Sequence, residues 1–385
     1  MIRDFDDESA IDLASKLRFG ITLSMYHPTT ELVRAGVLAE KYGFDSLWVQ
    51  DHFTDLPPSG DKVDPWTLMS AIGVQTRRVK LSPGVTDVQR LHPAKMAHIV
   101  ATLHELTEGR TMLAIGAGEA MNIRPYGLPW EEPDVRVDRL RESIQVMRLL
   151  WNSTRDKPVN YKGTFYTLEG AWLDQHPYRG RIPKVYIGAL GSRRTLRLVG
   201  EIGDGYFPWF NTLDTFRKRV SVIESAAESV GRSIKDIDLV VLLFAAITKD
   251  ESLRKRAINM IKPEIAVLNH RDLLGKMGYQ MKPAGRADYS YQHVLGTTQA
   301  AKMAASLSEE MPDEIAEQFM LTGSPDSCIE KIDKFAALGA THIVLRDAIG
   351  QYVFGSVDRG EETMKELGQK VLPYFQDLQV ASRTK

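Results

Sequence analysis

Cysteine is almost missing from this chain, whose 385 residues include only Cys328. A single cysteine forms no internal disulfide, and it excludes a metal cage built from several cysteine ligands. So little cysteine is typical of proteins of the reducing cytoplasm. The first 17 residues are charged throughout and contain no apolar signal-peptide core. We therefore expect a cytoplasmic protein.

Long hydrophobic runs and an excess of one charge are missing as well. No apolar run approaches the length needed to span a membrane, so we expect no membrane partner. The 49 lysines and arginines nearly balance the 50 aspartates and glutamates, which leaves no field to gather nucleic acid. There is no Gly-x-Ser-x-Gly elbow, which argues against a serine hydrolase. A small-molecule substrate is the partner that we expect.

The chain is rich in short β-prone runs that alternate with amphipathic helical patterns. Apolar residues recur at spacings of three and four in TELVRAGVLAEKYG and PAKMAHIVATLHELTEG. About eight strand–helix units predict a closed (β/α)8 TIM barrel. An open doubly wound sheet is the alternative, but its glycine signature would follow the first strand, where this chain has MYHPTT. The predicted strands are 18–25, 46–50, 80–87, 110–118, 184–190, 205–210, 238–247 and 341–346.

Two longer stretches interrupt this spacing. Residues 119–183 contain a long helix, about 134–152, and an inserted β-hairpin that turns at Lys162–Gly163. Residues 262–312, between strands seven and eight, form an excursion rich in Gly, Lys, Tyr and His. Long structured loops of barrels usually lie over the active site, and an ordinary surface elaboration fits equally well. We expect one domain over 1–385 with these two insertions.

Titratable residues stand where two of the predicted strands end, which is where barrels place their chemistry. Asp51 and His52 follow the second strand, and Glu119 follows the fourth. Each one alone fits a helix cap or a solvated loop, but together they predict a site with an acid or a base. His52, His92 and Glu119 place no two ligands close together on one element, so we expect no metal site.

A glycine turn follows the fourth predicted strand. Gly116 and Gly118 precede Glu119, whose carboxylate would repel a phosphate. The two glycines suit a close approach of the backbone to a large flat ligand.

A second glycine turn, IGALGSRR, follows the fifth predicted strand and is the better anion site. Gly188 and Gly191 lie in the turn, and Ser192 is placed to cap the next helix. Backbone N–H groups and the helix dipole favour a phosphate there, and Arg193 and Arg194 are placed to assist. A plain glycine-capped turn with two solvated arginines is the alternative.

These motifs together resemble the bacterial luciferase-like superfamily, and within it the branch that uses the deazaflavin coenzyme F420. The resemblance rests on SLWVQDHF, SPGVTDVQRLHPAKMAHIVATLHELTEGR, AIGAGEAMN and VYIGALGSRRTLRLVGEIGDGY. GAGEAMN is similar to a segment of F420-dependent alcohol and sugar-phosphate dehydrogenases. NIRPYGLPWEEP resembles phthiodiolone ketoreductases and methylene-tetrahydromethanopterin reductases. The resemblance implies a barrel enzyme that transfers a hydride between F420 and a carbonyl, alcohol or methylene-pterin substrate.

The resemblance also implies roles for individual residues. Asp51 and His52 would face the reactive ring, with His52 as a proton carrier and Glu119 as the acid or base beside the substrate. A cis peptide at Gly84–Val85 would form a bulge behind the ring. The implied cofactor-binding residues are Gly84, Val85, Thr86, Gly116, Gly118, Asn122, Gly188, Ala189, Gly191 and Ser192.

Two departures bear on the substrate. The sugar-phosphate enzymes of this branch have a tryptophan soon after Asp-His and a lysine after strand six. This chain has Leu56 in the first region and no lysine before Lys218 in the second, which argues against glucose 6-phosphate.

Two rival functions remain open at this point. One is an FMN-dependent monooxygenase of the same superfamily, and the other is a flavin-binding barrel without catalysis.

The resemblance implies a homodimer as well. Met69, Met96 and Ile99 lie on the helices after strands two and three. They predict an apolar surface there that exceeds what the barrel needs.

Overall fold

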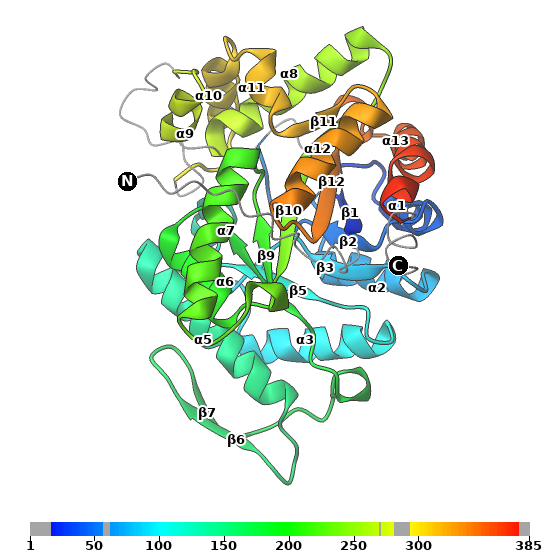
Figure 1. Ribbon diagram of the computed structural model, residues 1–385. Helices are drawn as coiled ribbons and strands as arrows, with labels where there is room; N and C mark the ends of the chain where they lie inside the picture. Colours follow the sequence, from blue (N-terminus) through cyan, green and yellow to red (C-terminus); the bar gives the residue numbers. More distant parts are fainter. Residues whose placement is uncertain (1–16, 57–61, 269–270, 281–292, 377–385) are drawn as a thin grey trace, which may run out of the picture.

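The computed structural model describes residues 17–56, 62–268, 271–280 and 293–376. Parallel strands form a barrel surrounded by helices (Figure 1). The strands follow one another around it in the order β3-β2-β1-β12-β10-β9-β8-β5-β4, and a parallel bridge links Leu81 of β3 to Thr111, which lies just before β5. The predicted (β/α)8 barrel is therefore confirmed. The barrel strands are β1 (Arg18–Leu23), β2 (Ser46–Val49), β3 (Lys80–Pro83), β4 (Thr86–Asp87), β5 (Leu113–Gly116), β8 (Val185–Ala189), β9 (Gly205–Pro208), β10 (Asp238–Ala246) and β12 (His342–Asp347).

The third predicted strand is divided in two. β3 pairs with β2, whereas β4 pairs with β5 on the other side. The peptide bond between Gly84 and Val85 lies between them and is cis, as predicted.

Helices cover the outside of the barrel. They start at recognisable signals: Asp64 accepts a hydrogen bond from the backbone of Thr67 at 2.7 Å, and Thr212 and Thr215 form a reciprocal capping box. None of the described helices has the length and apolar character that a bilayer crossing requires. The helices that follow barrel strands are α1 (Thr30–Lys41), α2 (Pro65–Gln75), α3 (Pro93–Leu106), α4 (Ala120–Ile123), α5 (Pro133–Trp151), α6 (Arg193–Ile202), α7 (Leu213–Glu228), α12 (Pro325–Ala337) and α13 (Val357–Lys370).

The core has two layers because the strands are buried on both faces. In β2, Leu47 and Val49 belong to the cluster between the strands and the helices, whereas Trp48 belongs to a second cluster. Trp48 reaches across the barrel interior to Tyr186 of β8 and Phe207 of β9, with ring centroids 5.4 and 4.6 Å apart. Side chains therefore fill the barrel interior beneath the strand ends.

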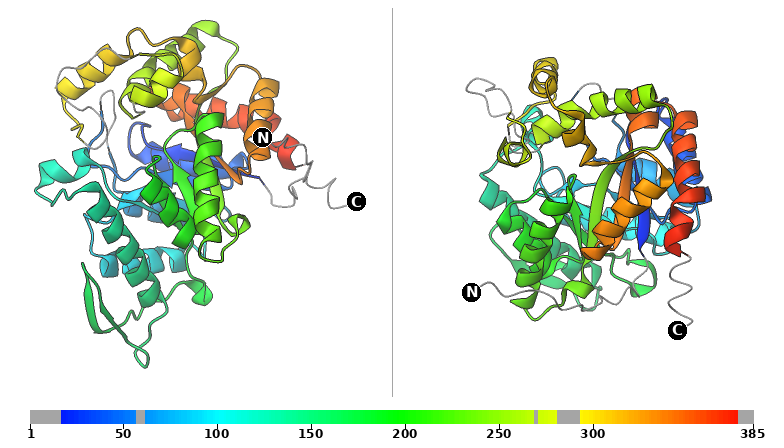
Figure 2. Two further views of the ribbon diagram at one scale, coloured as in Figure 1. Left: turned by 60° about the vertical axis from the view of Figure 1, so that its left-hand side comes forward. Right: turned by 45° about the horizontal axis from the view of Figure 1, so that its top comes forward.

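The two insertions lie at opposite ends of the molecule (Figures 1 and 2). The predicted hairpin is present as β6 (Val159–Lys162) paired antiparallel with β7 (Thr167–Ala171). The second insertion begins earlier than predicted, because α8 (Glu251–Leu268) runs through residue 262 without a break. It continues as α9 (Arg271–Lys276), α10 (Thr298–Ser308) and α11 (Asp313–Glu317), followed by β11 (Met320–Thr322), which pairs with β10. Its residues 281–292 lie outside the described part of the chain.

The methionines expected to mark a dimer surface are buried in the barrel's own core. Met69 is 0% exposed and Met96 is 1% exposed. The large apolar side chains that are most exposed on α2 and its neighbour α3 are Val74 and Leu106, the last residue of α3. The two methionines therefore mark no dimer surface. Ile99, the third residue of that expectation, is partly exposed on α3, and the homodimer stays a prediction.

Two buried histidines are held in the neutral form. Burial, with Arg181 nearby, lowers the pKa of His104 to about 4, and its Nδ1 accepts a hydrogen bond from the backbone of Tyr178 at 3.0 Å. Burial also holds the pKa of His342 well below its ordinary value. Both rings must therefore gain a proton when the chain unfolds in mild acid.

Acid should consequently destabilise the fold. Below pH 6.5 the unfolded chain protonates His104 and the folded chain does not until about pH 4, so the free energy of unfolding falls as the pH drops. The slope for one histidine is at most about 1.4 kcal/mol per pH unit. Urea unfolding at pH 7 and pH 5 should show a weaker pH dependence for His104→Asn than for wild type, with exposed His98→Asn as the control. Equal dependence in H104N and wild type would contradict this expectation.

Candidate active site

A cleft opens where several barrel strands end, with about 1000 Å³ of empty space, part of it open to solvent. Its walls come from the residues that follow β2, β4, β5, β8 and β9 and from the starts of α5 and α6. Gly191 lies in the β8–α6 turn but does not line the cleft. All other predicted site residues do: Asp51, His52, Gly84, Val85, Thr86, Gly116, Gly118, Glu119, Asn122, Gly188, Ala189 and Ser192.

His52 and Glu119 meet in the wall of this cleft. His52 Nε2 lies 3.2 Å from Glu119 Oε2, and the side chains are 10% and 27% exposed. Glu119 is the residue before α4, but its carboxylate does not cap that helix. The carboxylate is therefore free to face the cleft and the histidine. His52 follows β2 and Glu119 follows β5. The sequence predicted that both residues lie at the same end of the barrel, but not that their side chains are in contact.

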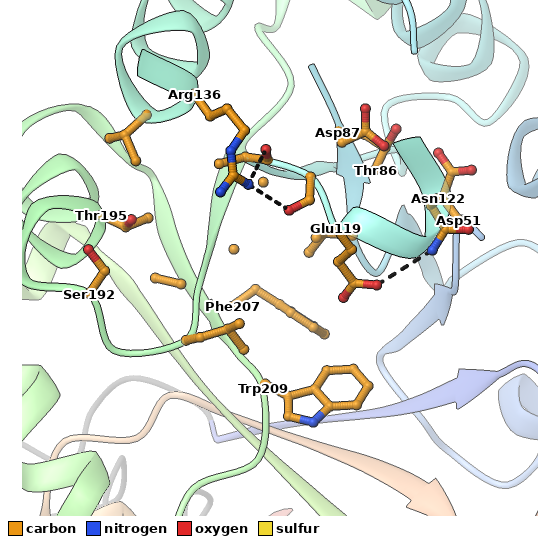
Figure 3. Close-up of a pocket in the computed structure, with 18 of the residues that line it drawn as sticks. Asp51, Thr86, Asp87, Glu119, Asn122, Arg136, Ser192, Thr195, Phe207 and Trp209 are labelled. Atoms are coloured by element: carbon orange, nitrogen blue, oxygen red, sulfur yellow. Dashed lines mark hydrogen bonds between the residues drawn. The ribbon is translucent and has the colours of Figure 1, made fainter. Parts of the chain in front are cut away.

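Asn122 holds the loop that carries His52. Its carboxamide oxygen accepts hydrogen bonds from the backbone of Phe53 at 2.8 Å and Thr54 at 3.1 Å. Its Nδ2 lies 3.5 Å from Glu119 Oε2, a marginal contact drawn in Figure 3. Although Asn122 lines the cleft, it therefore also has a structural task that the sequence did not indicate.

Asp51 takes part in a largely buried ion cluster next to this pair. Arg90 Nη1 donates to Asp51 Oδ1 at 2.9 Å, Nη2 donates to the Asp51 carbonyl at 2.9 Å, and Nε donates to Asp87. Burial raises the pKa of Asp51 even though Arg90 opposes that shift. The cluster anchors the end of β4 to the end of β2.

The floor of the cleft is made of small residues around Val85. A Cβ atom added to Gly116 would come within 3.2 Å of the Val85 side chain, and one added to Gly188 within 3.0 Å. Both glycines thus leave room for Val85 as well as for a ligand. Gly118 has a φ of 87°, a left-handed conformation that side-chain-bearing residues rarely adopt.

The start of α6 forms the far side of the cleft. Figure 3 shows Ser192 and Thr195 on this side, opposite Asp51 and Asn122. Contrary to expectation, the Ser192 side chain makes no capping hydrogen bond with the helix, so the start of α6 keeps backbone N–H groups available. Arg194 forms an ion pair with Asp138 at the surface and does not line the cleft.

Two prominent lining residues were missed by the sequence analysis. Arg136 of α5 is 2% exposed, stacks on Trp130 at 3.6 Å, and points Nη1 toward the carbonyl of Gly118 at 3.4 Å. Trp209 directly follows β9, and its buried Nε1 has no hydrogen-bond partner among the described residues. The strand-end rule would have found Trp209, whereas nothing local distinguishes Arg136 from other arginines of its helix. Further lining residues are Asp87, Arg90, Ala117, Pro133, Asp134, Val137, Leu190, Thr195, Phe207 and Pro208.

The described part of the second insertion packs beside the same rim. Leu56, from the loop after His52, packs with Met121 of α4 and Val294 of the insertion. A Cβ atom on Gly296 would come within 2.7 Å of the Thr54 hydroxyl. The insertion therefore supports the loop that carries His52.

No group of three or more His, Cys, Asp or Glu side chains within the described ranges is arranged to hold a metal ion. The cleft instead combines an acid–base pair, a floor of small residues and a helix start. Such an arrangement suits a flat organic ligand with an anionic group.

Comparisons with known proteins agree with this architecture. The chain matches the family model for luciferase-like monooxygenases over residues 13–342. It is 28% identical to a 5,10-methylenetetrahydromethanopterin reductase of Archaeoglobus fulgidus over 93% of this chain and 99% of that protein. It is 33% identical to a phthiodiolone/phenolphthiodiolone dimycocerosates ketoreductase of Mycobacterium sp. (strain JLS), over 74% of this chain and 80% of that protein. A solved F420-dependent secondary alcohol dehydrogenase in complex with an F420-acetone adduct superposes with a TM-score of 0.74 and 25% identity, over 90% of this chain and 98% of that one.

Proposed function

Because this chain belongs to the luciferase-like monooxygenase family, we propose that it is an oxidoreductase that uses coenzyme F420 to transfer a hydride to or from a small organic substrate. The observation that carries the proposal is the His52–Glu119 contact of 3.2 Å in the wall of the cleft. Hydride transfer to a carbonyl, or from an alcohol, needs one proton to be moved near the reacting carbon. The named relatives include a ketoreductase and an alcohol dehydrogenase, which supports this class of substrate.

The residues of the cleft fit a deazaflavin. The small floor at Gly116, Val85 and Gly188 leaves a flat surface for a ring, and the start of α6 at Ser192 offers N–H groups for a phosphate. When bound, the deazaflavin supplies or accepts the hydride.

The chain's own residues would manage orientation and the proton. Trp209 and Phe207 provide apolar walls that exclude water from the reacting atoms. Glu119 faces the cleft and is placed to exchange a proton with a substrate oxygen. His52 beside it is placed to donate a hydrogen bond to that same oxygen.

An FMN-dependent monooxygenase is the second candidate, because the family model carries that description. The two functions share the fold and a ring-binding cleft, and they differ in the cofactor and in the use of oxygen. Cofactor binding therefore decides between them.

Purified protein should bind F420 with a dissociation constant of micromolar or tighter, about −8 kcal/mol or better. Titration followed by cofactor fluorescence measures this, with FMN titrated in parallel. Ser192→Asp places a carboxylate at the start of α6 and should weaken F420 binding at least about tenfold. Ser324→Asp makes the same change at the start of α12, away from the cleft, and should leave binding unchanged. Tight FMN binding with no F420 binding would refute the proposal.

A further inference from the structure

A chain of polar contacts runs from Lys62 to the cleft. Lys62 Nζ donates to Gln50 Oε1 at 2.9 Å and lies 3.0 Å from Asp55 Oδ2. Gln50 Nε2 lies 3.0 Å from Asp55 Oδ2 and 2.9 Å from His52 Nδ1. At the other edge of the ring, His52 Nε2 lies 3.2 Å from Glu119 Oε2. Hydrogen bonds therefore connect Lys62 with Gln50 and Gln50 with His52, and an ion-pair contact connects His52 with Glu119.

The orientation of the Gln50 amide is set by its two charged neighbours. The Lys62 ammonium can only donate, so the amide oxygen must face it. Burial opposes ionisation of Asp55, but Lys62, with a smaller contribution from His52, holds the pKa of Asp55 well below its usual range. An ionised Asp55 can only accept, so the amide nitrogen must face it. A flipped amide would place its N–H groups against the Lys62 ammonium and its oxygen against the Asp55 carboxylate.

This orientation determines which nitrogen of His52 carries the proton. The Gln50 amide has two N–H groups, one for Asp55 and one for His52 Nδ1. Nδ1 must therefore accept, and the ring proton must lie on Nε2, the nitrogen that is 3.2 Å from Glu119 Oε2. Asp55 Oδ2 lies 3.7 Å from Nδ1, which is too far to hold a proton there by a hydrogen bond.

We propose that Gln50 and Lys62 are positioning residues that keep His52 as the neutral Nε2–H tautomer, so that His52 donates a hydrogen bond and Glu119 carries the proton. To act as a base, His52 would need a free lone pair on Nε2, and its proton would then point from Nδ1 at the Gln50 amide N–H. An imidazolium ring also carries a proton on Nδ1, and that proton would face the Gln50 amide N–H. This replaces the expectation that His52 is the proton carrier. The statement about the tautomer is independent of the proposed function, and the statement about catalysis rests on it.

The tautomer is measured directly by nitrogen-15 NMR of the histidine side chains in the full-length protein at neutral pH, without cofactor. The His52 signals are assigned by their loss in His52→Asn. Wild type should show an unprotonated Nδ1 and a protonated Nε2. In Gln50→Glu a carboxylate faces Nδ1, so the ring should change to the Nδ1–H form or to the imidazolium. A protonated Nδ1 in wild type, or an unchanged pattern in Q50E, would overturn the proposal.

Two further variants keep the test decisive if Q50E folds poorly. Lys62→Met removes the ammonium that faces the amide oxygen and that keeps Asp55 ionised against burial, so both constraints on the amide weaken and the Nδ1 signal should show a mixture of tautomers. The matched control Lys95→Met removes an exposed lysine of α3 and should reproduce the wild-type pattern. An unmixed wild-type pattern in K62M would also overturn the proposal.

Turnover then tests the catalytic half. If the enzyme reduces a carbonyl with reduced F420, K62M should lower kcat at least about tenfold with little change in cofactor affinity. If kcat is unchanged although the tautomer has changed, the proposed role of the tautomer in catalysis is overturned, whereas the assignment of the tautomer stands. If no F420 turnover exists, the proposed function fails while the NMR result still decides the tautomer.

Discussion

Replacing Glu119 by glutamine should lower turnover by about 10²- to 10⁴-fold while cofactor affinity stays nearly constant. Glutamine has the same size, and its amide oxygen can take the place of the carboxylate oxygen that lies 3.2 Å from His52 Nε2. What it loses is the ability to take up or release a proton at the cleft. The side chain is partly exposed and no shape is lost, so folding should be unaffected. The expected loss is therefore chemical rather than structural.

The measurement is steady-state oxidation or reduction of F420, followed by its absorbance, with a panel of ketones and secondary alcohols. Glu330→Gln, at the exposed surface of α12, makes the same chemical change far from the cleft and should keep full activity. Unaltered turnover in E119Q would remove Glu119 as the acid or base and would return that role to His52. It would also contradict the proposal that Glu119 carries the proton while His52 only donates a hydrogen bond.

Replacing Arg90 by methionine should destabilise the fold by about 3–5 kcal/mol at neutral pH. Arg90 is the shared partner of Asp51 and Asp87, and all three side chains are largely buried. Its removal leaves two buried carboxylates close together without a cation. Leaving a buried charge without a partner is far more costly than losing an exposed ion pair.

The pH dependence of R90M distinguishes this cause from lost packing. Burial already raises the pKa of Asp51, and losing Arg90 should raise it further. A carboxyl group with a raised pKa in the folded state costs stability as the pH rises through that pKa, so the penalty should shrink in mild acid. Urea unfolding at pH 5 and pH 8 measures it, with the exposed Arg34→Met as a control that should change little. A penalty that is the same at both pH values would indicate lost packing instead.

Local patterns were sufficient to predict the architecture and the rim of the site. The alternation of strand and helix depends on periodicity over a few residues, and it predicted each of the barrel strands. The rule that chemistry gathers at strand ends then identified Asp51, His52 and Glu119 before any contact was known. The same rule applied to GYFPWF would also have indicated Trp209.

Other features could not be derived in this way, because they depend on residues that are distant in the chain. Met69 and Met96 looked surplus on isolated helices, but closure of the barrel buries them. The sequence indicated only that Gly116 and Gly188 lie in turns that bind a ligand. In the structure each glycine also leaves space for the side chain of Val85, which lies between β3 and β4. Nothing in its own helix marks Arg136, whose place is set by the packing of α5 beside the β5 turn.

By itself, then, the sequence determined the order of the elements, the (β/α)8 class, and which residues stand at the carboxyl ends of the strands. These follow from backbone hydrogen bonding and from apolar periodicity between near neighbours. Only the tertiary structure decided the partners of those residues: Glu119 for His52, Arg90 for Asp51, and Lys62 for Gln50. Barrel closure and the return of a loop bring these groups within about 3 Å, where hydrogen bonding and ion pairing begin to act.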